Sequence, residues 1–347
     1  MERPIVVIDA EGGLSRELSV FGTTHPLFHK KIVACDLTLG MITPYNPFVI
    51  NGGIYSKQLV HRIAGGFGRL FAGKNPILPP LFEYIAQIVT ISNLEPGPKI
   101  GVPVFHILLS KMWPKLITEG PNPNIIEDNE LLSANLLSAL NDSHNLSAED
   151  VSFLMKQALA PLLEEPFNSI LGHPAPLSDT KNMIMTQRLF LVDSGVKHDW
   201  AGYQYGSKII PVNKSSALVF SEIVLCDYWA NAMEIYHRTF QRLPILYLVN
   251  SEQIPAFLPW PEVFESLDNM DGHFFIFTEN REGMSKTFDS MVEGKAWTRY
   301  PYDRLSKLID GERGYSPLKA IEAYSIPLME AQRITTAWTE IIRNMPF

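Results

Sequence analysis

The chain has 347 residues, 46% of them hydrophobic, and its 37 acidic and 29 basic residues give a net charge of -8. This length allows one large or two medium domains, and the hydrophobic content excludes a disordered chain. The acidic balance argues against a surface that binds nucleic acid throughout, and the apolar stretches are shorter than the ~20 residues of a membrane span.

The first predicted element is a strand that begins almost at the first residue. Ile5-Val-Val-Ile8 is a β-branched run that ends in Asp9 and opens through Gly12-Gly13 into a polar segment. Such a run is typical of a buried parallel strand whose carboxyl end carries a functional loop. The stretch from Asp9 through Glu11 fits a metal or ribose site, and it equally fits a strand-ending turn. Because the strand starts so early, we expect no phosphate loop ahead of it.

Three regions differ in their predicted secondary structure and define the predicted domains. Residues 1–55 form the first part of an α/β core, and residues 56–187 form a helical insertion. Residues 188–347 form the second part of the core with C-terminal helices. In the insertion, apolar residues at helical spacing predict several short helices. One of them is expected to start at Ser147, an N-cap residue followed three positions later by Asp150.

The last region alternates predicted strands with predicted helices. A strand ends in Asp193, a long helix follows over 216–241, and two further apolar strands end at Asn250 and near Thr278. This alternation predicts a mostly parallel, doubly wound sheet. Cys35 and Cys226 each lie in an apolar run, which favours buried free thiols in a reducing cytosol.

Several catalytic motifs are absent or imperfect. Gly68 to Asn75 approaches the phosphate-loop pattern, but it follows a predicted helix and lacks the final hydroxyl residue, so we interpret it as a helix end. The nine histidines show no metal-ligand spacing, so no metal site is predicted. After Val249, Asn250 and Ser251 stand where a magnesium-nucleotide site would carry Asp and Glu. No catalytic residue can be assigned.

The order of elements resembles the FtsK/HerA class of DNA-pumping ATPases, especially the type IV coupling proteins and motor ATPases of conjugation and type IV secretion. The resemblance rests on three short motifs: Val6 to Gly12, Val33 to Asp36, and Asn46-Pro47-Phe48. It implies a RecA-like α/β core with an inserted all-helical domain. Residues 56–165 would form that insertion, and the strand before Asn250 would be the one that bears the acid pair in the family.

The resemblance also implies a site and a function. A vestigial nucleotide cleft would gather Asp9, Glu11, Asn46, Asn250, Glu252 and Asn280. Its ligands would be ATP and magnesium, although no cofactor is certain. The expected function is a degenerate, non-hydrolysing motor-ATPase-like subunit of a DNA or protein transfer machine. It would form homo- or hetero-oligomers with motor or secretion subunits, with DNA as a further partner. We expect a cytoplasmic chain, recruited to the inner face of a membrane complex without inserting into the membrane.

Two alternatives remain open at this point. The chain fits a structural or scaffold protein of a mobile element or virus, with no nucleotide site. It also fits a small-molecule α/β enzyme that uses Asp9, Asp193 or Glu252 at the carboxyl edge of the sheet. A deep polar pocket would favour the enzyme, and an apolar outer patch would favour the scaffold.

Overall fold

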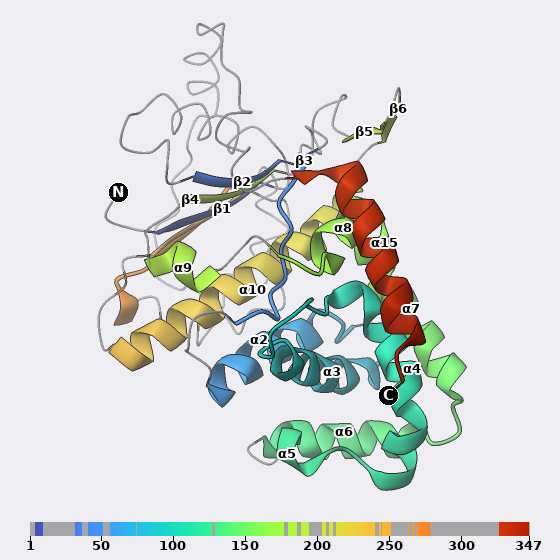
Figure 1. The fold of residues 1–347 in the computed structure, drawn as a ribbon. Helices are drawn as coiled ribbons and strands as arrows, with labels where there is room; N and C mark the ends of the chain where they lie inside the picture. Colours follow the sequence, from blue (N-terminus) through green and yellow to red (C-terminus); the bar gives the residue numbers. More distant parts are fainter. Residues whose placement is uncertain are drawn as a thin grey trace, which may run out of the picture.

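A sheet of short strands lies above a layer of helices (Figure 1). The computed structural model describes residues 4–9, 32–36, 41–50, 56–73, 75–126, 129–176, 180–185, 189–193, 203–205, 208–210, 213–239, 243, 245–250, 263, 266, 269–277 and 326–346. The five strands of the main sheet are β1 (Ile5–Asp9), β2 (Ile32–Asp36), β4 (Leu189–Asp193), β7 (Leu246–Asn250) and β8 (His273–Phe277). They are ordered β2-β4-β1-β7-β8, and every neighbouring pair is parallel.

Two small antiparallel pairings accompany this sheet. The short strand β3 (Met41–Ile42) pairs with β9 (Ile326–Pro327), and β5 (Tyr203–Tyr205) pairs with β6 (Lys208–Ile210). The first pairing joins the segment after β2 to the C-terminal part of the chain, which continues directly into the last helix.

Helices make up most of the described residues. They are α2 (Lys57–Arg69), α3 (Leu78–Ser92), the short 3-10 helix η1 (Val102–Val104), α4 (Phe105–Glu119), α5 (Pro123–Ile126), α6 (Glu130–Asp142), α7 (Ala148–Leu163), α8 (Phe167–Gly172), α9 (Thr180–Met185), α10 (Lys214–Thr239) and α15 (Leu328–Asn344). Side-chain caps fix several starts. Ser56 accepts a hydrogen bond from the Leu59 amide, and Ser147 forms a reciprocal capping box with Asp150, which confirms the predicted start of α7.

Five phenylalanines form the centre of the helical layer. They are Phe48 in the segment after β3, Phe67 in α2, Phe71 in the turn after α2, Phe82 in α3 and Phe105 in α4, and all are buried. The rings of Phe71 and Phe82 are stacked with centroids 4.0 Å apart, and Phe67 meets Phe48, Phe82 and Phe105 edge-on at 5.3–5.7 Å. Offset and edge-on pairs add about 0.5–1.5 kcal/mol each beyond their burial. This cluster therefore fixes the angles between the first three long helices.

Helix α10 connects this layer to the sheet, because it runs beneath the strands (Figure 1). Val6 and Ile8 of β1 and Tyr247 and Val249 of β7 are buried on the core side of the sheet. The same core contains the apolar residues of α10, such as Phe220. Alternate strand residues point to opposite faces, so Val7 and Asp9 face the other side.

The last helix, α15, is held against the helical layer by two long-range hydrogen bonds. The Trp338 indole donates to the Lys99 carbonyl at 2.9 Å, and the Lys111 ammonium donates to the Ile342 carbonyl at 2.9 Å. The second bond satisfies a terminal carbonyl with a cation at the negative end of the helix dipole. These contacts bring the C-terminal end of α15 beside α4 (Figure 1).

The predicted fold class requires a correction. The sequence predicts a RecA-like, doubly wound α/β sheet of the P-loop NTPase type, but the described residues are mostly helical and each strand of the main sheet has only five residues. The described helices lie below the sheet or beside it (Figure 1), whereas a doubly wound sheet has helices on both faces. The physical reason is that most of the buried core forms between helices. Short apolar runs in the sequence predict individual strands, but they do not show that helices will form most of the core.

This correction removes the assignments that depended on the RecA-like core. The description as a P-loop NTPase-like pseudo-ATPase is not retained, and neither are the assignments to type IV secretion and conjugation. Within the described residues, every helix is too short or too polar to cross a lipid bilayer.

Close packing of α2 against α10 depends on a glycine. A Cβ added at Gly66 would lie 2.0 Å from the Cys226 sulfur but 3.5 Å from the Cys226 Cβ. We expect Gly66→Ala to lower the free energy of unfolding by about 1–3 kcal/mol, because the extra methyl overpacks this interface. Removing the sulfur should restore the space. Chemical denaturation of Gly66→Ala, Cys226→Ala and the double variant measures the coupling. The steric account predicts that the double variant loses less stability than the two single variants lose together. A loss equal to their sum, or larger, would show that the account is wrong.

Two histidines in the helical layer should make stability depend on pH. Burial lowers the pKa of His106, helped by the positive charges of Lys156 and Arg343, and burial also lowers the pKa of His173. The unfolded chain then binds protons more readily than the folded chain once the pH falls below the ordinary value of 6.5. We expect stability to fall between about pH 7.5 and pH 5.5, and His106→Gln with His173→Gln to flatten this dependence. Urea unfolding at both pH values tests this, and an unchanged slope in the double variant would contradict it.

Candidate functional site at the carboxyl edge of the sheet

Four polar residues stand at one level along the carboxyl edge of the sheet. The parallel register pairs Asp36 with Asp193, Asp193 with Asp9, and Asp9 with Asn250. Neighbouring strands lie about 4.8 Å apart, so these four positions form a continuous row across four strands. Phe277 continues the same level on the fifth strand. The row is the clearest polar feature that the sheet creates.

Asp9 lies at the centre of this row and is completely buried. It shares its face of β1 with Val7, opposite to the residues that contact α10. A buried carboxylate is costly unless hydrogen bonds or opposite charges compensate it. Asp9 is therefore held in a defined environment at the edge where open parallel sheets place their ligands. A carboxylate at this edge can accept hydrogen bonds from a polar ligand.

The structure brings together only part of the predicted site. Asp9 and Asn250 are direct register partners on β1 and β7, as the predicted cleft requires. Glu11, Glu252 and Asn280 follow the ends of β1, β7 and β8 in the sequence, but they lie outside the described residues.

Asn46 has a structural role in the helical layer. Its amide nitrogen donates to the Ile100 carbonyl at 2.8 Å, and its side-chain oxygen accepts from the Phe48 amide at 3.0 Å. Asn93 donates to the carbonyls of Ile100 and Phe48, at 2.9 Å and 3.2 Å. Two buried asparagines thus join the turn after β3 to the loop before η1. The hydrogen bonds of Asn46 serve the helical layer.

Sequence reasoning missed a buried polar cluster around Asp227 of α10. The Asp227 carboxylate accepts hydrogen bonds from the Tyr45 hydroxyl and, at 2.5 Å, from the Thr180 hydroxyl. The Asn231 side chain donates to its other oxygen at 2.8 Å. The sequence did contain a signal: Asp227 is followed four residues later by Asn231, and both lie within an apolar part of α10. The cluster connects α10, α9 and the segment after β3.

The electrostatics of this cluster favour a structural role. Burial raises the pKa of Tyr45 well above its ordinary value, and the neighbouring charge of Asp227 raises it further. Burial also raises the pKa of Tyr247, with a smaller contribution from Asp227. Both phenols therefore stay protonated. A neutral Tyr45 keeps donating to the carboxylate, which helps to compensate the cost of burying Asp227.

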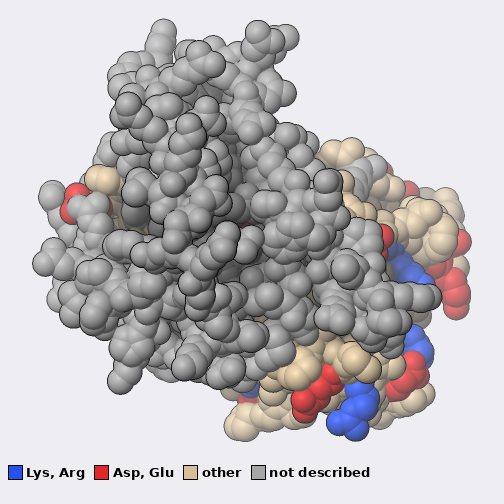
Figure 2. Space-filling model, turned by 90° about the horizontal axis from the view of Figure 1, so that it is seen from above, with Lys and Arg blue, Asp and Glu red and all other residues tan. Residues whose placement is uncertain are grey.

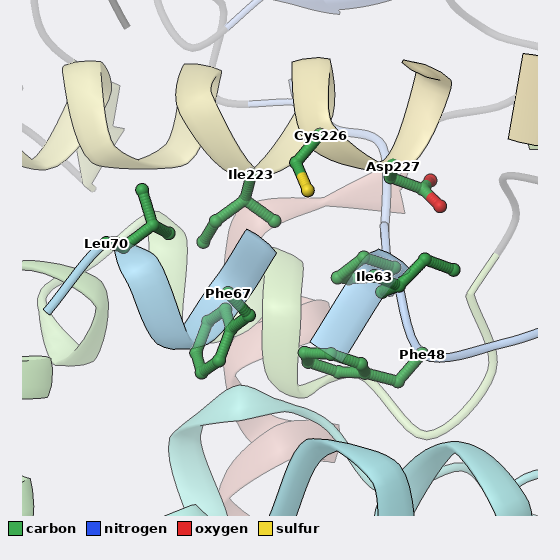
Figure 3. Close-up of a pocket in the computed structure, with 8 residues that line it drawn as sticks. Phe48, Ile63, Phe67, Leu70, Ile223, Cys226 and Asp227 are labelled. Carbon is green, nitrogen blue, oxygen red and sulfur yellow. The ribbon is translucent and has the colours of Figure 1, made fainter. Parts of the chain in front are cut away.

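A small cavity lies beside this cluster, between α2 and α10 (Figure 3). Its volume is about 10 Å³, room for about one water molecule. The lining is almost entirely apolar and consists of Pro47, Phe48, Ile63, Phe67, Leu70, Ile223, Cys226 and Asp227. The Asp227 carboxylate points away from Phe67 and Leu70 (Figure 3). This cavity is far too small for a nucleotide.

Cys226 lines the cavity as a protonated thiol. Burial raises its pKa to about 12, and it is a free cysteine, as the sequence predicts. Because the thiolate is the nucleophilic form, Cys226 is a poor nucleophile at neutral pH. The side chain of Cys35 lies outside what the structure describes.

The glycine-rich stretch that approaches a phosphate-loop pattern is explained by packing. Gly68 lies inside α2, and a Cβ there would come within 2.8 Å of the Pro79 carbonyl oxygen. Gly66 meets Cys226 in the same way on another side of the helix. The glycines allow α2 to approach α3 and α10 closely, and the interpretation as a helix end rather than a phosphate loop is consistent with this position.

Within the described residues, neither a patch of surface charge nor a group of metal ligands indicates a second functional site. On the face seen in Figure 2, the described Lys and Arg side chains lie among Asp and Glu side chains and do not form a field of one sign. Among the residues whose side chains the structure describes, which include Asp9 but not Asp36, Asp193 or Asn250, no group of three or more His, Cys, Asp or Glu could hold a metal ion. No known family model and no curated protein sequence matches this chain.

Proposed function

We propose that this chain is a non-hydrolysing subunit of a DNA or protein transfer machine, and that it works by assembly with other subunits. The observation that supports assembly is the exposure of large apolar side chains on the outer helices. Leu131 and Leu137 of α6, Phe153 of α7, and Met329 and Ile341 of α15 are between 47% and 73% exposed. Apolar surface of this kind commonly marks contacts with other proteins.

The non-hydrolysing part of the proposal rests on chemistry at the strand edge. Hydrolysis of a magnesium-bound nucleotide requires carboxylates that orient the metal and polarise water. Asn250 and Ser251 follow the apolar run of β7, and neither side chain carries a negative charge. The transfer-machine part rests on the short motif resemblance at Val6 to Gly12 and at Asn46 to Phe48.

The test of this part is nucleotide binding and turnover by the purified chain. We expect no ATP hydrolysis and no magnesium-dependent ATP or ADP binding in calorimetry at millimolar nucleotide. Magnesium-dependent turnover that disappears in Asp9→Asn would contradict the proposal, because it would place a working site at the carboxyl edge. Lys115→Ala changes an exposed residue of α4 and is the matched control. Activity from a contaminating ATPase would be the same in both variants, whereas activity at the carboxyl edge would be lost only in Asp9→Asn.

A second candidate function is supported by the row of Asp36, Asp193, Asp9 and Asn250. Three acids in register at the carboxyl edge fit a small-molecule enzyme or a cation-binding protein. Calorimetry with Mg²⁺ and Ca²⁺ distinguishes this candidate from the first. Binding that is lost in both Asp9→Asn and Asp193→Asn would favour a ligand site over assembly alone.

A further inference from the structure

Helix α6 is the outermost helix of the helical layer, at the side of the molecule opposite the sheet (Figure 1). Its inner face is buried through Leu132, Leu136, Ala139 and Leu140, and it packs on α3 and α5. Its outer face carries Leu131, which is 73% exposed, and Leu137, which is 47% exposed. On a helix these two positions bracket an arc of about 120°.

The outer face of α6 differs from that of an ordinary solvated helix because it has no charge along its middle. No residue from Leu131 to Asn141 is charged, and the exposed positions within this arc are Ala134, Ser138 and Asn141. Surface helices usually place charged side chains on the face opposite the core. Two exposed leucines on an uncharged arc therefore form a face suited to contact with another apolar surface.

The segment of the chain that contains this face is acidic. Between Lys115 and Lys156 the chain contains seven acidic residues and no Lys or Arg. The exposed acids among the described residues are Glu119, Glu130, Asp142, Glu149 and Asp150. Two of these, Glu130 and Asp142, are the first and last residues of α6. The uncharged arc is therefore bordered by negative charge at both ends.

This charge pattern selects the kind of partner. A second copy of the chain is disfavoured, because pairing α6 with itself places acids beside acids: Glu130 beside Asp142 in an antiparallel pair, or Glu130 beside Glu130 in a parallel pair. A nucleic acid is disfavoured because the acidic border repels phosphates. A helix with an apolar stripe and flanking Lys or Arg is complementary in both shape and charge.

We propose that α6 is the docking face for an amphipathic helix of a partner protein, whose leucine-type stripe contacts Leu131 and Leu137 and whose basic flanks meet Glu130 and Asp142. The inference rests on the proposed assembly function and specifies its surface. The partner helix would lie in contact with the exposed arc of α6, away from the polar row of the sheet. Salt should weaken the charged part of the contact and leave the apolar part.

The test uses two synthetic helical peptides with the same leucine stripe, one flanked by lysines and one by glutamates. Fluorescence anisotropy measures their binding to the full chain. We expect the lysine peptide to bind and the glutamate peptide not to bind. Leu131→Ser with Leu137→Ser should weaken binding at least about tenfold, which corresponds to about 1.4 kcal/mol. The matched control, Leu94→Ser with Met185→Ser, changes two exposed apolar residues elsewhere and should leave binding within about twofold.

Equal binding of both peptides, or binding that survives the α6 substitutions, would overturn the docking face. So would self-association that depends on Leu131 and Leu137 in sedimentation velocity, because the occupant would then be a second copy. Both leucines are exposed, so the variants should fold, and thermal unfolding verifies this. The size of the chain in a cell extract separates this inference from the proposed function. Large assemblies that persist in the α6 variant would refute only the docking face, whereas a monomeric wild-type chain would refute assembly itself.

Discussion

Gly101→Ala is expected to cause one of the largest losses of stability that a single methyl group can produce in this chain. A Cβ at Gly101 would lie 1.8 Å from the Leu171 carbonyl oxygen and 3.2 Å from the Gly172 Cα. Both are backbone atoms of α8, which cannot rotate away as a side chain can. The backbone angles at Gly101, φ -118° and ψ 176°, are open to any residue, so the obstacle is space alone. We expect a loss of about 3 kcal/mol or more.

Gly73→Ala is the matched control, because a Cβ there meets nothing within 4 Å. Urea denaturation of both variants gives the comparison, with the change at Gly73 expected to stay within about 0.5 kcal/mol. A Gly101→Ala protein as stable as the control would show that α8 does not approach the loop before η1 as closely as described.

Removing the Asp227 carboxylate should be comparably destabilising. Asp227→Ala leaves the donors of Tyr45, Thr180 and Asn231 buried without this acceptor. Each unsatisfied buried donor costs about 1–3 kcal/mol, so we expect a total loss of about 3 kcal/mol or more. Tyr45→Phe removes one donor and should cost less. Chemical denaturation of each variant, and of the double variant Tyr45→Phe with Asp227→Ala, measures how strongly the two residues are coupled.

Asp142→Ala provides the matched control for this series, because it removes an exposed aspartate from another helix. It should change the free energy of unfolding by no more than about 0.5 kcal/mol. Strictly additive losses for Tyr45→Phe and Asp227→Ala would contradict the hydrogen-bonded cluster, since residues that share a bond must couple.

Local sequence patterns predicted many individual elements well. The strands that end in Asp9, Asp193 and Asn250 occur where the apolar and β-branched runs indicated, and α10 covers almost the whole predicted range of 216–241. Ser147 begins α7 through the predicted cap. These features depend on neighbouring residues in the sequence, and a single chain contains that information.

Features that depend on distant residues were not predictable in the same way. The Tyr45–Asp227 contact joins residues 182 positions apart, and only the fold shows that this acid of α10 meets a tyrosine. Asn46 was assigned to a cleft because its motif resembled that of a family, but its partners include Ile100, 54 positions away. The doubly wound class failed for a related reason: strand signals indicate strands, but they do not show how much of the core helices will form.

The row at the carboxyl edge of the sheet was predicted in part. The sequence placed Asp9 and Asn250 at strand ends, and parallel register makes them neighbours. The order of the strands, which adds Asp36 and Asp193 to the same row, depends on pairing between segments far apart in the chain. Local sequence patterns do not contain that order.

The most direct test of assembly is the size of the native chain in an extract of its own cells. Gel filtration under gentle conditions, followed by antibody detection, compares it with the purified chain of 39.1 kDa. We expect the native chain to elute in a complex well above the mass of the purified monomer. Elution of the whole population at the monomer mass would contradict the assembly account and leave the polar row of the sheet as the site to pursue.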